Sequence, residues 1–191
     1  MLDHRDALQV IHQVRGEQIV ISTMTSVGIW SEISDTALDF AYLPSSMGQG
    51  ISLGLGLALA QPVRGVIAVI GDGSLLMNLG SLVTVANHPA PLHVVLIDNG
   101  VYELTGGQRT AGSRRTDFAS LARAAGINRV YEFNVLADWE AAAAEVLNSP
   151  DPSFVWLHVN QQTGPSPAAT AKHPMREQIA RLRERLVLGD G

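Results

Sequence analysis

The chain contains no cysteine among its 191 residues. Disulfide bonds, thiolate metal sites and a cysteine nucleophile are therefore excluded, and cysteine usage gives no information about the cellular compartment. Basic residues are also scarce, because 13 lysines and arginines stand against 18 aspartates and glutamates, for a net charge of −5. Proteins that bind the phosphate backbone of nucleic acids need basic patches, so nucleic acid is not an expected partner.

Long apolar runs are lacking as well. No run reaches the roughly 18 residues that a membrane-spanning helix requires, and the first six residues are too charged for a signal peptide. We therefore expect no membrane association and a cytoplasmic location. A hydrophobic content of 46% at this length favours one compact domain over residues 1–191, in which residues 161–191 form a linker and a C-terminal helix.

Apolar strand-like runs alternate with helix-like segments along the chain. We expect strands at 18–21, 39–43, 66–70, 93–97, 128–133 and 153–159. Helices are expected at 3–14, 29–33, 50–60, 74–87, 117–125, 138–147 and 174–187, a loop at 23–28 and an irregular stretch at 100–116. This order predicts an α/β fold: a single doubly wound domain with a mostly parallel sheet and helices on both faces.

Two polar residues follow two of these expected strands directly. Asp72 lies in the sequence Gly71-Asp72-Gly73 after the run 66–70, and Asn99 comes 27 positions later, after the run 93–97. Open α/β sheets bind ligands at the carboxyl ends of their strands. Mg²⁺ prefers oxygen ligands and commonly shares its shell with phosphate, and a helix that begins near Gly73 could receive phosphate on its free N–H groups. The pattern predicts a site for Mg²⁺ and a diphosphate, although Gly-Asp-Gly alone is also an ordinary turn.

The order strand, Gly-Asp-Gly, helix, strand and Asn at this spacing resembles the cofactor-binding domain of thiamine diphosphate enzymes. The resemblance implies the thiamine diphosphate-binding fold, with thiamine diphosphate and Mg²⁺ as cofactors. It also implies that Asp72, the side chain of Asn99 and the carbonyl of Val101 bind the metal. Further cofactor-binding residues in the same two stretches are Gly71, Gly73, Ser74 and Tyr102.

Residues 44–50, Pro-Ser-Ser-Met-Gly-Gln-Gly, resemble the GSMG or GSIG turn of the same family. Met47 matches the bulky apolar residue that holds the cofactor in a V shape, and the alternative is that it merely fills the core. The carbonyl of Ser45 would accept a hydrogen from the aminopyrimidine, although the family usually has glycine there, and Ser46 completes the turn. The glycines of the following helix suggest close approach to a neighbouring helix or subunit, because glycine costs about 1 kcal/mol against alanine there.

Residues 105–108, Thr-Gly-Gly-Gln, resemble a stretch of the sulfopyruvate and phosphonopyruvate decarboxylase group. By this resemblance Gly107 and Gln108 close over diphosphate or substrate, and the alternative is a solvated loop. Arg109 departs from the proline that is typical after this stretch, and two further arginines follow. Arginine forks recognise sulfonate, phosphonate or carboxylate, but surface arginines are usually only solvated. The sequence leaves open whether Arg109, Arg114 and Arg115 bind substrate.

Most of residues 1–160 are similar to the small separate subunit of that decarboxylase group. The resemblance implies a subunit of a thiamine diphosphate-dependent carboxy-lyase that decarboxylates a 2-oxo acid with a second anionic group, such as sulfopyruvate or phosphonopyruvate. Family enzymes protonate N1′ of the cofactor with a glutamate from a pyrimidine-binding domain, for which 191 residues leave no room. No glutamate here matches that residue. We therefore expect it on a pyrimidine-domain partner in a hetero-oligomer, with homodimeric contacts as an option.

Other functions remain open at this point. An acetolactate synthase-like or benzoylformate-like carboligase or decarboxylase subunit fits the same cofactor motifs. A non-catalytic thiamine diphosphate-binding protein fits the absence of the glutamate, although it need not keep both metal ligands and the residue at position 47. Neither the substrate, nor the partner's identity, nor the oligomeric state follows from the sequence.

Overall fold

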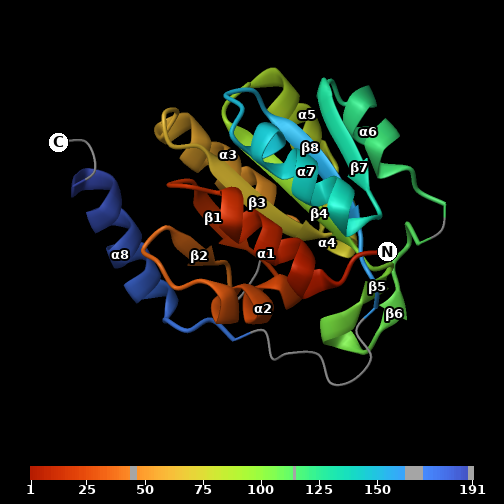
Figure 1. Ribbon diagram of the computed structural model, residues 1–191, viewed down its shortest axis with the longest axis horizontal. Coiled ribbons are helices and arrows are strands. Elements are labelled where there is room, and N and C mark those ends of the chain that lie inside the picture. The colour runs from red at the N-terminus through yellow and green to blue at the C-terminus, as the bar shows by residue number, and fades with distance from the viewer. Residues whose placement is uncertain (44–46, 114, 162–169, 189–191) are drawn as a thin grey trace.

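Figure 1 shows a computed structural model of the chain, in which one sheet runs between layers of helices. The structure describes residues 1–43, 47–113, 115–161 and 170–188. Six strands form a parallel sheet in the order β2-β1-β3-β4-β8-β7. Their bounds are β1 (Ile19–Ser22), β2 (Asp39–Ala41), β3 (Val66–Gly71), β4 (Leu92–Asp98), β7 (Arg129–Phe133) and β8 (Ser153–His158).

Two hydrophobic cores join the sheet to its helices, one on each face of the sheet. Alternate residues of the central strands point to opposite faces, so Ile67 and Val69 belong to one core and Ala68 and Ile70 to the other. This explains the continuous apolar runs, since a parallel sheet is buried on both sides. The first core includes α1 (His4–Val14), α2 (Thr25–Ile33) and α7 (Leu136–Leu147), and the second includes α3 (Gly50–Ala60), α4 (Asp72–Leu76), α5 (Gly80–Asn87), α6 (Phe118–Ala124) and α8 (Met175–Leu188). The predicted doubly wound α/β fold is confirmed.

Three local expectations differ from the structure. The loop expected at 23–28 is wrong, because α2 already begins at Thr25. The single helix expected at 74–87 is also wrong, since it divides into α4 and α5 where the Asn78 side chain donates to the carbonyl of Gly48 at 3.0 Å. The stretch expected to be irregular, 100–116, contains a hairpin of β5 (Val101–Tyr102) and β6 (Gln108–Arg109) with the 3-10 helix η1 (Glu103–Thr105) between them.

Two glycines of α3 lie close to the sheet, whereas the sequence suggested that they lie close to a neighbouring helix or another subunit. A Cβ atom at Gly50 would lie 3.0 Å from Cγ2 of Thr23, and one at Gly54 would lie 2.9 Å from Cδ1 of Leu92. Gly56 has nothing within 4 Å of such an atom. Glycine therefore lets α3 pack closely on β1, β3 and β4 at two positions, and the third is tolerated without a close neighbour.

The C-terminal helix α8 covers the edge of the sheet formed by β2, beside which it runs in Figure 1. The side-chain carbonyl of Gln178 accepts a hydrogen bond from the backbone N–H of Ala41 at 2.7 Å, which satisfies a donor of this edge strand. Arg181 adds an ion pair to Asp35 at 3.1 Å. The predicted C-terminal helix is thus present, and residues 162–169 of the predicted linker lie outside the described residues.

Polar pairs gather where the strands begin, at the amino edge of the sheet. Arg15 forms a buried salt bridge with Asp39, and the side-chain amide of Gln18 donates to the carbonyl of Leu147 at 2.6 Å. His93 Nδ1 lies 2.8 Å from Ser153 Oγ, and burial lowers the pKa of His93 to about 4, so this histidine is neutral at pH 7. These contacts tie β1, β2, β4, α7 and β8 together far from the strands' carboxyl ends.

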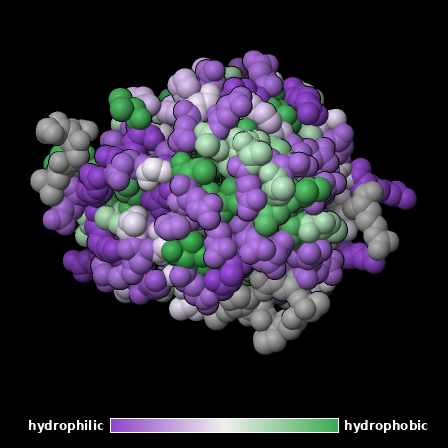
Figure 2. All heavy atoms as spheres, viewed as in Figure 1, coloured by the Kyte–Doolittle hydropathy of each residue, from purple (hydrophilic) through white to green (hydrophobic). Residues whose placement is uncertain are grey.

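Hydrophilic side chains predominate on the face shown in Figure 2, and hydrophobic ones gather toward the middle of that view. None of the helices in the described part of the chain combines the length and the apolarity needed to cross a bilayer.

Candidate cofactor-binding site

A cavity opens at the carboxyl edge of the sheet. Strands β1 and β3 are neighbours, but the helices that follow them, α2 and α4, pack into opposite cores. Such a reversal leaves a crevice outside the strand ends, where α/β sheets bind ligands. The lining comes from three strand ends, the first helix and the turn before α3: His4, Thr23–Ser26, Met47, Gly71–Ser74, Ile97, Asn99 and Val101–Thr105.

Asp72 presents a buried carboxylate to this cavity. Asp72 is 2% exposed and is the first residue of α4, so the turn after β3 places its carboxylate at the cavity. The pKa of Asp72 is raised to about 6, chiefly by burial and also by the nearby charge of Asp98, against the opposing hydrogen bonds from Thr110 and from the N–H of Gly73. Desolvation penalises the ionised form. A cation bound here would offset that penalty, so the carboxylate fits a metal ligand.

Asn99 and Val101 bring the other predicted metal ligands to the same cavity from the end of β4. The side-chain oxygen of Asn99 accepts a hydrogen bond from the N–H of Val101 at 3.0 Å, and an amide oxygen keeps a second lone pair for a cation. Within the described residues, no group of three or more histidines, aspartates and glutamates could hold a metal ion. A metal in this cavity would therefore rely on one carboxylate, an amide, a carbonyl and oxygens from a bound ligand, which suits Mg²⁺.

The turn that carries Met47 is fixed to the start of α4. The hydroxyl of Ser74 accepts a hydrogen bond from the N–H of Gly48 at 2.9 Å, and Gly48 has a φ of +84°, which favours glycine. Met47 lines the cavity and is 48% exposed, so it does not fill the core. Ser45 and Ser46, the other residues predicted in this turn, lie outside the described residues.

Gly73 leaves room for the ring of Tyr102. A Cβ atom at Gly73 would lie 2.7 Å from Cδ1 of that ring and closer still to Cε1, and 3.1 Å from Cγ2 of Thr110. The glycine of the Gly-Asp-Gly sequence therefore allows the hairpin of β5 and β6 to rest directly on the start of α4. Through this contact the segment after β3, which carries Asp72, meets the hairpin after β4, which carries Val101.

Gly107 and Gln108 lie at the exposed tip of the hairpin and do not line the cavity. The side-chain amide of Gln108 donates to the carbonyl of Thr105 at 2.9 Å, so it points back along its own turn. Arg109 is exposed on β6, Arg115 is exposed after it, and Arg114 lies outside the described residues. The closure of Gly107 and Gln108 over a ligand, and substrate binding by the arginines, stay predictions.

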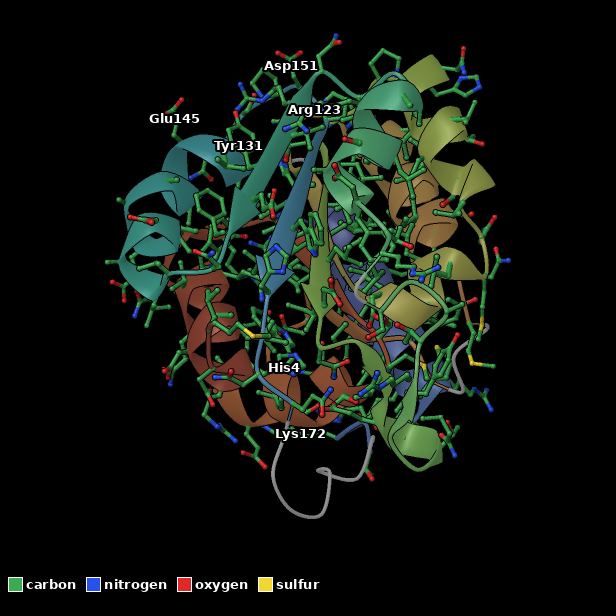
Figure 3. The ribbon with its side chains drawn as sticks, turned by 90° about the vertical axis from the view of Figure 1, so that its right-hand side faces the viewer. His4, Arg123, Tyr131, Glu145, Asp151 and Lys172 are labelled. Carbon is green, nitrogen blue, oxygen red and sulfur yellow. The ribbon has the colours of Figure 1, made fainter. Side chains whose placement is uncertain are left out.

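Sequence reasoning missed the contribution of His4 and of the segment that follows β1. His4 Nε2 lies 3.0 Å from Ser26 Oγ, and burial lowers the pKa of His4 to about 4. In Figure 3 His4 is found at the end of the sheet where the β5–β6 hairpin also lies. The residues Thr23–Ser26 could have been found from the rule that was applied to Asp72, because they too follow the carboxyl end of a strand.

The family described as "Thiamine pyrophosphate enzyme, C-terminal TPP binding domain" matches residues 22–157. Phosphonopyruvate decarboxylase from Streptomyces hygroscopicus is 43% identical over 119 residues, which are 62% of this chain and 29% of that protein. Sulfopyruvate decarboxylase subunit beta from Methanothermobacter thermautotrophicus is 41% identical over 86% of this chain and 84% of its own length. The chain thus spans less than a third of the first relative and most of the second.

Solved structures agree with the fold. The thiamine diphosphate-dependent 4-hydroxybenzoylformate decarboxylase of Rhodococcus jostii RHA1 matches with a TM-score of 0.72 and 22% identity, covering 85% of this chain and 33% of that one. Benzoylformate decarboxylase from Polynucleobacter necessarius matches with a TM-score of 0.75 and 18% identity, over 86% and 34% of the two chains. At these identities the likeness concerns the fold alone.

Proposed function

The chain belongs to the thiamine pyrophosphate enzyme family through its TPP-binding domain, and from this premise we propose that it is the cofactor-binding subunit of a 2-oxo acid decarboxylase. The substrate in this proposal carries a second anionic group, as in sulfopyruvate or phosphonopyruvate. Support comes from relatives with these two activities in their names, at 43% and 41% identity. The observation that carries the proposal is the cavity in which Asp72 and Asn99 meet.

In this proposal Asp72, the Asn99 side chain and the Val101 carbonyl hold Mg²⁺, and the metal holds the diphosphate of thiamine diphosphate. The support is the buried, unfavourably desolvated carboxylate of Asp72 and the presence of Asn99 and Val101, which offer oxygen donors, in the lining of the same cavity. The first N–H groups of α2 also border the cavity, since Thr25 and Ser26 line it and no side chain caps this helix. Such groups favour anions, so we include them among the diphosphate-binding groups.

When bound, thiamine diphosphate supplies the nucleophilic carbon and the electron sink for decarboxylation. The chain's own residues supply position and surroundings. Met47 presents its side chain to the cavity from a turn that Ser74 and Asn78 hold in place, which suits a residue that bends the cofactor. Ile97 and Leu104 add apolar walls that keep water from the reacting carbon.

The proposal includes a second subunit with a pyrimidine-binding domain. The relative that matches over most of its own length is called subunit beta, and the phosphonopyruvate decarboxylases that match are about three times as long as the matched part. We place the glutamate that protonates N1′ on that partner. Arg109, exposed on β6, and Arg115, exposed after the hairpin, are candidates to bind the substrate's second anionic group.

Calorimetric titration tests the cofactor assignment. Thiamine diphosphate with Mg²⁺ is titrated into the chain alone and into the chain copurified with its partner subunit, in parallel with Asp72→Ala and with Asp151→Ala as an exposed control carboxylate. We expect saturable, Mg²⁺-dependent binding in the complex, loss of it in Asp72→Ala and no change in Asp151→Ala. Equal binding by Asp72→Ala contradicts the metal assignment, and no binding by either parent preparation contradicts the cofactor assignment.

The substrate assignment has a separate test in the loaded complex. Neutralising Arg109 as Arg109→Gln should raise KM for a doubly anionic oxo acid more than for pyruvate, because a bidentate guanidinium contact to the second anion is lost. A matching change at Arg183 on the exposed face of α8 serves as the control. Equal effects on both substrates would remove Arg109 from the proposal and leave the cofactor site intact.

A further inference from the structure

The hydroxyl of Thr110 touches the candidate metal ligand from the side of the hairpin. Thr110 follows β6 and is 3% exposed, although its neighbour Arg109 is exposed. Its Oγ1 donates to Oδ2 of Asp72 at 2.5 Å, and its backbone N–H donates to the carbonyl of Gly100 at 3.0 Å. A threonine 38 positions away in the sequence is thus held rigidly against the carboxylate.

We propose that Thr110 is the positioning residue of the metal site, an inference that rests on the proposed function. An ionised carboxylate only accepts hydrogen bonds, so the Thr110 hydroxyl donates its proton to Oδ2 and takes one of the two lone pairs of that oxygen. A hydrogen bond from a hydroxyl to a carboxylate is among the stronger kinds in proteins. The bond fixes the orientation of the carboxylate, and a cation that took both oxygens would have to share Oδ2 with Thr110, so the geometry favours a single metal bond from Asp72.

The hairpin joins this contact to the other two metal ligands. It begins just after Asn99, whose side chain accepts from the N–H of Val101, and it closes through the pairing of Val101 with Arg109. Thr110 comes directly after that pair. The same short hairpin therefore carries the Val101 carbonyl, orients Asn99 and, through Thr110, orients Asp72, so a shift of the hairpin would disturb all three ligands together.

Restriction to one oxygen has a consequence for metal choice. Mg²⁺ is small and demands near-octahedral geometry, whereas Ca²⁺ is larger and readily takes both oxygens of one carboxylate. If the Thr110 hydroxyl competes with a cation for Oδ2, its loss makes a second bond from Asp72 to the metal easier. The selectivity for Mg²⁺ over Ca²⁺ should then fall, and a role of Thr110 in stability alone has no such effect.

The experiment uses the complex of the chain with its partner subunit, saturated with thiamine diphosphate. Mg²⁺ and Ca²⁺ are titrated separately by calorimetry into the parent, Thr110→Val, Thr110→Ser and the exposed control Thr84→Val. The hydroxyl of Thr84 donates to the carbonyl of Gly80 within α5. Thr110→Val keeps the shape of the side chain and removes the hydroxyl. If this variant does not fold, Thr110→Ala is used in its place. Losing an outer-shell partner typically costs 10–100-fold in metal affinity.

We expect the Kd for Mg²⁺ to rise by about 10-fold or more in Thr110→Val, with a smaller rise for Ca²⁺, and near-parent values in Thr110→Ser and Thr84→Val. Unchanged Mg²⁺ affinity in Thr110→Val overturns the inference while the cofactor site stands. An equal loss for both cations, or no rescue by serine, also overturns it, because the hydroxyl would then only stabilise the fold. Failure of the parent complex to bind Mg²⁺ removes the proposed function and this inference together.

Discussion

Replacing Gly73 with alanine should disable the site with little damage to the fold. The added Cβ would lie 2.7 Å from Cδ1 of Tyr102 and closer still to Cε1, whereas carbon atoms in contact are 3.5–4.0 Å apart. The ring must therefore move by about 1 Å or more. Because Tyr102 belongs to β5, this movement displaces the hairpin that carries Val101 and Thr110.

The expected loss of stability is small because two effects oppose each other. Inserting a methyl group into a packed contact costs roughly 1–3 kcal/mol. Alanine in α4 returns about 1 kcal/mol relative to glycine. The net cost of about 0–2 kcal/mol should lower Tm by no more than about 8 °C for a chain of this length. Mg²⁺-dependent binding of thiamine diphosphate should fall by at least about 10-fold, since the ligands lose their mutual geometry.

The assay pairs thermal denaturation of the chain with calorimetric titration of the complex. Gly80→Ala is the matched control, since a Cβ there meets nothing within 4 Å. A double-mutant cycle with Tyr102→Ala isolates the clash, because the substitution at Gly73 should be nearly neutral for stability when the ring is gone. The reasoning is refuted if Gly73→Ala binds the cofactor as the parent does, or if it destabilises the chain equally with and without the Tyr102 ring.

Three further outcomes follow from buried charges. The free energy of unfolding should decline as pH falls from 6.5 toward 4, because the unfolded chain protonates histidines that the folded chain keeps neutral. His4 and His93 each account for about 3 kcal/mol of this decline. Urea titrations of His4→Gln should therefore show a shallower decline than the parent. Without metal, Asp72→Asn should have a higher Tm than the parent at pH 8, because the raised pKa of Asp72 means that folding disfavours the ionised carboxylate. This difference in Tm should vanish below about pH 4, where Asp72 is protonated in both the folded and the unfolded chain. Asp39→Ala should cost about 3–5 kcal/mol in urea unfolding, because Arg15 is left buried without its partner, and cofactor affinity should not change.

Each of these outcomes has an opposing result. A flat stability profile between pH 7 and 5 would mean that the two histidines do not stay neutral. Equal Tm values for Asp72→Asn and the parent at pH 8 would mean that the carboxylate is not desolvated. A loss below about 1 kcal/mol for Asp39→Ala would show that water reaches Arg15.

The strands and most helices could be predicted because burial on both faces leaves a direct mark on the sequence. The run 66–70 became β3 and the run 93–97 became β4, and both form the centre of the sheet. Helix α3 was predicted with its observed bounds in spite of its glycines, since its apolar content is decisive. The start of α2 could not be predicted in the same way, because Thr25, Ser26 and Gly28 are weak helix formers that tertiary burial holds in place.

The positions of residues around the cavity could be predicted where they depend on strand ends, and could not where they depend on a loop that folds back. Asp72 and Asn99 were identified because each follows a strand of a parallel sheet, and the structure brings both to one cavity. Thr110 was missed because its contact with Asp72 requires the hairpin to fold back, and no periodicity marks that path. His4 was missed because its helical pattern shows only a buried face, not which neighbour it meets.

The polar pairs at the amino edge lie at the opposite end of the strands from the cavity. Arg15 with Asp39 and His93 with Ser153 hold the strands together there, whereas the groups that line the cavity lie at the other end. Substitutions in Thr23–Ser26 or in the hairpin should consequently change the lining of the cavity without weakening those contacts. Conversely, lesions at Arg15 or His93 should reveal themselves in cells as reduced protein abundance, with the specific activity of the surviving molecules preserved.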